Sequence, residues 1–295
     1  MTHPTARNRR AFRRSAAAIL AALEPRLVFA AAEPTAHEQY LLELINRGRA
    51  DPSAESVRYN VALNEGLAAG TISTAAKQPL AMNNFLVSAA RGHADWLRVN
   101  NVFRHEGANN STPTQRMLAA GYTTSGSWGT GENLAITMSS QSSVNLTQQV
   151  EANYRNLFVD ANYAGRGHRI NLMNASFESA GTGVSSGSYT SNGTTWPGSV
   201  LVNQDFAYTS GNAFLTGVAY DDKVTDDNFY TPGEQLAGVK VVAKSSGGAT
   251  YQTTTGAAGG WSLQVPDGTY TITATNGAGK VVTYKNVVVA GANVK

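Results

Sequence analysis

The sequence predicts an α+β protein in which a mixed region of helices and strands precedes an all-β region. Helical and strand-like patterns are interleaved over residues 36–210, and short β-rich runs separated by turn residues follow over residues 213–295. The 295-residue chain is 42% hydrophobic and contains no cysteine. It has enough apolar residues for packed cores, whereas disulfides, thiol catalysis and cysteine-bound metal sites are excluded.

Residues 1–32 have the composition of an export leader. The basic segment at 7–14 precedes an apolar run at 15–23, which is too short to cross a bilayer because spanning takes about 20 residues. Arg9 and Arg10 lie in a context that resembles a twin-arginine export signal. The L-E-P-R segment at 23–26 resembles the N-terminal segment of exported planctomycete-type bacterial proteins. We expect a secreted or cell-surface bacterial protein whose mature chain has no transmembrane anchor.

The formal net charge of +3 depends on this leader. The leader holds six arginines and one acidic residue, so the rest of the chain carries a net charge of −2. No run of lysine and arginine follows it. A surface that tracks nucleic-acid phosphates is therefore not expected.

Four helices and several strands are expected in the mixed region. The clearest helix spans 83–99, where apolar residues follow the i, i+3, i+4, i+7 spacing. Another begins at Pro113, after a polar cap, and ends at Gly121. The remaining expected elements are a helix containing 41–45 that stops before Pro52, a helix containing 146–158, a strand at 200–207 and, within the Gly-, Ser- and Thr-rich tract 181–199, a strand followed by a loop or hairpin turn.

Residues 213–295 form the second expected region, connected to the first near residues 209–212. Helical periodicity is lost there, and β-rich runs recur with Gly- and Asp-containing turns between them, which is typical of a small β-sandwich. The runs are 214–220, 239–244, 261–265, 269–275 and 281–289.

Three short motifs contain the residues best suited to chemistry. They are F-R-H-E-G at 103–107, G-E-N-L at 131–134 and G-H-R-I-N-L at 167–172. If the fold brings His105, Glu132 and His168 together, they suit a borderline divalent ion such as zinc, or acid–base chemistry near neutral pH. In the alternative interpretation, each only makes hydrogen bonds within the fold, and Glu132 and Asn133 order a turn. We interpret His93, on an apolar helix face, as a core histidine.

Together with N-R-G-R-A-D-P at 46–52 and A-R-G-H-A-D-W-L at 90–97, these motifs resemble those of a bacterial CAP-superfamily domain, also called the SCP domain, over residues 36–210. The resemblance implies an α-β-α sandwich with a cleft lined by two histidines and two acidic residues. By motif, His105, Glu132 and His168 match three of the four positions.

The fourth position departs from the family pattern. Where the family often has W-x-x-E, this chain has L-F-V-D ending at Asp160, which is our candidate. The aspartate side chain is one methylene shorter, so it reaches less far toward a shared ion. Glu151 lies about two helical turns away and is the weaker alternative.

The resemblance implies varied roles for such a domain, including lipid or sterol binding, without one settled reaction. We therefore expect a secreted protein whose cleft binds a divalent metal and a small apolar or peptide ligand. Two other functions stay open. One is a zinc-dependent hydrolase or peptidase in which His105, His168 and one acid hold the metal and the other acid activates water. The other is a structural or adhesive surface protein.

The second region has a candidate calcium loop. Five acidic residues and a single lysine, Lys223, lie within fourteen positions, and oxygen-rich loops of this kind suit calcium. The loop resembles the calcium loop of SdrD-type B domains, and the runs that follow resemble the prealbumin-like sandwich of Cna-B and carboxypeptidase-regulatory-like modules. The alternative is a solvated acidic loop. The candidate ligands are Asp221, Asp222, Asp226, Asp227 and Glu234.

Overall fold

The computed structural model describes residues 31–161, 163–211 and 213–295. The predicted export leader lies outside the described residues, apart from its last two positions. Within the described ranges, no helix combines the length and the apolar character needed to cross a membrane.

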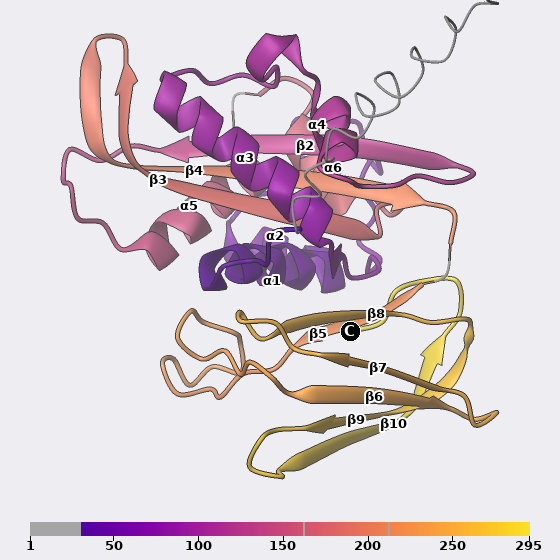
Figure 1. The fold of residues 1–295 in the computed structure, drawn as a ribbon. Coiled ribbons are helices and arrows are strands. Elements are labelled where there is room, and N and C mark those ends of the chain that lie inside the picture. The colour runs from indigo at the N-terminus through magenta and orange to yellow at the C-terminus, as the bar shows by residue number, and fades with distance from the viewer. Residues whose placement is uncertain (1–30, 162, 212) are drawn as a thin grey trace, which may run out of the picture. The chain divides into compact units, whose positions relative to one another are not determined.

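The first region consists of three layers, with helices on both sides of a mixed four-stranded sheet (Figure 1). The strand order is β1-β3-β4-β2, in which β1 pairs with β3 in parallel and the other pairs are antiparallel. Helix α3 packs on β3 and β4 and helix α4 on β2, whereas α1 and α5 cover the other face. The strands are β1 (Ala81–Met82), β2 (Trp128–Thr137), β3 (Ser179–Ser191) and β4 (Thr194–Thr209).

The helices begin where the sequence places capping residues. Thr35 and Glu38 form a capping box at the start of α1, and Thr112 and Gln115 form another at the start of α4. Gly121 follows α4 with φ +107, a backbone conformation that glycine adopts readily. The helices are α1 (Ala36–Ala50), α2 (Pro52–Arg58), α3 (Asn84–Asn100), α4 (Pro113–Ala119), α5 (Leu146–Val159) and α6 (Gly167–Met173).

Two glycines of β3 allow α3 to lie directly against the sheet. A Cβ atom on Gly181 would come within 2.0 Å of the backbone carbon of Leu86, and one on Gly183 within 2.3 Å of the backbone nitrogen of Arg91. Any larger residue at either position would force the helix away from the strand. Helix α3 ends at Asn100, and the loop that carries His105 follows it.

The structure corrects one local expectation and settles another. The G-E-N-L motif at 131–134 lies inside strand β2 and does not form a turn, because its backbone pairs with β4 throughout. The tract at 181–199 is a hairpin of β3 and β4, whose turn is made by Asn192 at φ +49 and Gly193 at φ +76.

The second region is a sandwich of a four-stranded sheet, ordered β10-β9-β6-β7, and a two-stranded sheet, β5-β8. The expected runs all contain strands, and the polar segment T-Y-Q-T-T was missed because it lacks an apolar pattern. The strands are β5 (Phe214–Val218), β6 (Lys240–Ser245), β7 (Thr250–Thr254), β8 (Gly260–Gln264), β9 (Gly268–Thr275) and β10 (Val281–Val289).

Buried arginines tie the segments of the first region together. The Arg49 guanidinium is fully buried and donates hydrogen bonds to the carbonyl oxygens of Gln78, Leu172, Asn174 and Phe177 at 2.8–3.2 Å. Burial lowers the pKa of Arg49 to about 10, which leaves it charged at neutral pH. Arg169 is equally buried and has a structural role, since its guanidinium also donates hydrogen bonds to backbone carbonyl oxygens.

We expect Arg49→Met to lower the free energy of unfolding by about 3 kcal/mol, because the substitution leaves buried carbonyl oxygens without donors. Urea denaturation followed by circular dichroism measures the change. Arg155→Met is the matched control, since Arg155 is exposed on α5. Equal losses in the two variants would contradict the role assigned to Arg49.

Candidate functional site

The first half of the site is a hydrogen-bonded pair formed by His105 and Glu132. His105 Nδ1 lies 2.8 Å from Glu132 Oε1, and the other carboxylate oxygen accepts from Arg116 Nη2 at 2.5 Å and Asn203 Nδ2 at 2.9 Å. The glutamate is almost fully buried, whereas the imidazole is about half exposed. A rigid carboxylate thus holds an imidazole that solvent can reach.

Within this pair, the pKa of Glu132 and the pKa of His105 both shift in the direction that favours the ionised form of each group. Burial works against ionisation of Glu132, but the hydrogen bond from His105 and the charge of Arg116 outweigh it and lower the pKa of the carboxyl. The hydrogen bond to Glu132 raises the pKa of His105, and partial desolvation of the ring opposes that shift.

The second half of the site repeats this arrangement with His168 and Asp160. Asp160 follows α5 in the left-handed conformation, at φ +51, and its Oδ1 lies 2.8 Å from His168 Nδ1. Its Oδ2 accepts the backbone N–H of His168 at 3.0 Å. The shorter aspartate therefore reaches its histidine because the two residues are joined by a short loop. Tyr163 packs on the imidazole with ring centroids 4.5 Å apart.

The two pairs lie on either side of the edge strand β2. Side chains alternate along a strand, so Glu132 points toward α3 and α4, and Asn133 toward α5 and α6. Asn171 on α6 connects the two sides, because its Nδ2 lies 3.3 Å from the Glu132 carbonyl oxygen and 3.0 Å from Asn133 Oδ1. Asn133 in turn donates to the His168 carbonyl oxygen at 3.2 Å.

Asp205, a residue that the sequence reasoning missed, lies beneath the first pair. It is fully buried on β4, directly opposite Glu132 in the strand register. Neither carboxyl oxygen has a hydrogen-bond donor among the described residues. Burial and the nearby Glu132 charge raise the pKa of Asp205 well above its ordinary value, which favours the neutral form of the group. The signal in the sequence was the polar tripeptide 203–205 inside an otherwise apolar strand.

Each of the two histidines leaves one ring nitrogen, Nε2, free of partners among the described residues. Each histidine uses Nδ1 for its carboxylate, and neither Nε2 has a hydrogen-bond partner within the described ranges. Metal-binding histidines commonly donate their second ring N–H to a carboxylate in this way. No group of three or more histidine, aspartate or glutamate side chains is placed to hold a metal ion in the part of the chain that the structure describes. Glu132 and Asp160 thus orient the histidines.

A match to a family model shows to which family the chain belongs. The model of the CAP family, described as the cysteine-rich secretory protein family, matches residues 42–204 and so covers more than half of the chain. The chain belongs to the CAP family. It does so without a single cysteine, so its CAP fold depends on packing and on buried polar networks such as that of Arg49.

Two solved structures resemble the chain at low identity. One is an extracellular SCP-domain protein from Bacillus anthracis str. Ames, with 18% identity, a TM-score of 0.36, and coverage of 59% of this chain and 40% of that chain. The other is NaASP2 with Zn²⁺, with 17% identity, a TM-score of 0.36, and coverage of 59% and 80%. The match spans less than half of the Bacillus anthracis chain. No curated protein matches the sequence.

His93 occupies the core position expected of it in the CAP fold. Its ring is buried, stacks on Trp96 at 5.8 Å between centroids, and its Nε2 lies 3.1 Å from the Arg104 carbonyl oxygen. Desolvation lowers its pKa, which favours the neutral form. The ring therefore supports the loop that carries His105.

The acidic residues of the loop at 221–234 mostly hold the loop's own backbone. Glu234 accepts from the amides of Val224, Thr225 and Thr231 at 2.7–3.0 Å. Asp222 accepts a hydrogen bond from the Asn228 amide at 2.8 Å, and Asp227 accepts one from the Phe229 amide. Calcium binding by this loop stays a prediction.

We expect Asp205→Asn to flatten the pH dependence of stability. The folded protein keeps a proton on Asp205 that the unfolded chain releases above the ordinary value of 3.8, so wild-type stability falls as the pH rises. The variant should gain on the wild type by up to about 1.4 kcal/mol per pH unit as the pH rises above the ordinary value of 3.8. Urea titrations measure this, with the exposed Asp226→Asn as control. Parallel curves for Asp205→Asn and wild type would contradict a neutral Asp205.

Proposed function

We propose that this protein is an extracellular CAP-family binding protein in which His105 and His168 hold a divalent cation through Nε2. The observation that carries the proposal is the duplicated pair: each Nδ1 lies 2.8 Å from a buried carboxylate oxygen, which fixes the ring and leaves Nε2 free. Membership of the CAP family, which is described as the cysteine-rich secretory protein family, supports the extracellular location.

The donor count supports binding over hydrolysis. Catalytic zinc sites take three protein ligands as a rule and structural sites take four. Here two imidazoles are available, and both carboxylates are engaged with their histidines. A cation held in this way keeps several positions for solvent or for a small apolar or peptide ligand. When bound, it would supply a positive charge at the exposed edge of β2.

Zinc titration of the full chain by calorimetry tests the metal site. We expect His105→Ala and His168→Ala each to weaken zinc binding by about 10-fold or more, because each removes a ligand. Asp160→Asn should weaken it by about 10- to 100-fold, as loss of an orienting partner does. Affinity should rise between about pH 6 and 8, since His105 has a raised pKa and must lose its proton first.

His37→Ala is the matched control, since His37 lies on α1 and contacts Thr147 at 3.2 Å. Unchanged zinc heats in the His105→Ala and His168→Ala double variant would contradict the site. Peptide turnover that disappears with chelator and with the double variant would instead favour the hydrolase.

We further propose that the loop at 221–234 binds calcium through its exposed carboxylates. Asp221 and Asp226 are exposed and accept no backbone hydrogen bond from the described residues, whereas their neighbours already shape the loop. We expect calcium to raise the melting temperature of the chelator-treated full chain, because a ligand that binds the folded state stabilises it. The Asp221→Asn and Asp226→Asn double variant should lose this rise. An equal rise in Asp51→Asn, the distant control, and in the double variant would place calcium elsewhere.

A further inference from the structure

The two edges of the four-stranded sheet in the second region differ in character. The edge strand β7 has the polar sequence T-Y-Q-T-T. The opposite edge strand, β10, exposes four large apolar side chains: Val281 at 55%, Val282 at 42%, Tyr284 at 61% and Val288 at 59%. Protein sheets usually protect such edges with charge, bulges, proline or a covering segment, because unpaired strands recruit other strands. The pairing of β10 with β9 has a register shift between Tyr284 and Val287, whereas residues 281–284 are regularly paired with β9 at the edge of the sheet.

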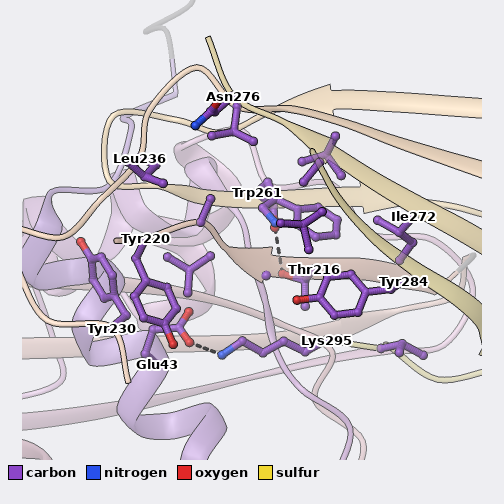
Figure 2. A pocket seen from close by; sticks show the side chains of 18 of the residues that line it. Glu43, Thr216, Tyr220, Tyr230, Leu236, Trp261, Ile272, Asn276, Tyr284 and Lys295 are labelled. Atoms are coloured by element: carbon purple, nitrogen blue, oxygen red, sulfur yellow. Dashed lines mark hydrogen bonds and ion pairs between the residues drawn. The ribbon is translucent and has the colours of Figure 1, made fainter. Parts of the chain in front are cut away.

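Beside β10 lies a cavity of about 860 Å³ that opens between the two sheets. Figure 2 shows Trp261, Ile272 and Tyr284 around this space, with Thr216 between Trp261 and Tyr284 and the Glu43–Lys295 ion pair at one end. Val282 and Tyr284 of β10 line the cavity and are exposed as well. The strand edge and the cavity therefore form one continuous apolar surface.

The charged residues at the free edge of β10 are lysines. Glu43 and Asp222 also line the cavity, and Glu43 forms an ion pair with Lys295. Lys280 lines the cavity and Lys285 lies on β10, and neither forms an ion pair with a described residue. A segment that carries acidic side chains beside its apolar ones would complement this edge.

We propose that the free edge of β10, with the cavity beside it, binds an extended acidic segment of another protein by strand addition. Main-chain hydrogen bonds to β10 supply affinity, and alternate side chains of the added strand enter the cavity, because side chains alternate along a strand. Acidic residues of the segment lie near Lys280 and Lys285.

The charges argue against a second copy of this chain as the occupant. Pairing of β10 with β10 would bring the lysines of both copies together at one edge. The chain's own acidic loop is also unsuited, since Asp222 and Glu234 bind backbone amides within the loop. A separate polypeptide with apolar and acidic side chains complements both the apolar surface and the lysines of this edge.

The test uses the full chain and a fluorescein-labelled peptide of alternating valine and threonine with two glutamates at each end. We expect saturable binding by fluorescence anisotropy, with a Kd below roughly 1 mM. Val282→Glu should weaken binding at least about tenfold, because a carboxylate at the cavity repels the peptide and disfavours apolar contact. Val57→Glu is the matched control, since Val57 is 81% exposed on α2. A peptide with lysines in place of the glutamates should bind less tightly.

Several results would overturn the proposal: no saturable binding, equal binding by Val282→Glu and Val57→Glu, or tighter binding of the lysine peptide. Circular dichroism checks that each variant is folded. If Val282→Glu does not fold, Val288→Glu on the exposed part of β10 takes its place. Sedimentation of the protein alone gives a further check. A dimer that Val282→Glu dissociates would assign the edge to a second copy and also overturn the proposal.

Discussion

The buried carboxylate of Glu132 is the interaction on which the site depends. It accepts hydrogen bonds from the loop after α3, from α4 and from β4, through His105, Arg116 and Asn203. An ionised carboxylate in this position is stable only with such partners, because a buried charge without them is costly. The same bonds that satisfy the charge also fix the imidazole of His105. Local stability and the geometry of the candidate site therefore have one physical cause.

Close packing in the CAP fold determines where these partners can lie. The glycines of β3 allow α3 to contact the sheet, and the loop that carries His105 follows this helix. Asp205 lies opposite Glu132 in the strand register, where burial and the glutamate charge favour its neutral form. A core without cysteine holds its segments through such buried hydrogen bonds and through the guanidinium groups of Arg49 and Arg169.

Much of the fold was predictable because local chemistry marks its elements. The helices begin at Thr35 and Thr112, where side-chain oxygens cap the first turn, and Gly121 marks the end of α4. The strand β7 was missed because its sequence, T-Y-Q-T-T, carries no apolar alternation. The motif at 131–134 was expected to form a turn, since glycine and asparagine favour turns. Its backbone pairing with β4 outweighed that local preference.

The sequence by itself determined the two kinds of region, the cysteine-free core and the identity of His105, Glu132, Asp160 and His168 as candidates. The regions and the lack of cysteine follow from composition and periodicity, and the four candidates follow from motifs that resemble those of the CAP family. Only the tertiary structure decided that the four residues form two pairs on either side of β2, with Asp205 beneath one of them. Strand register and helix packing bring these distant segments together, and no local pattern encodes that register.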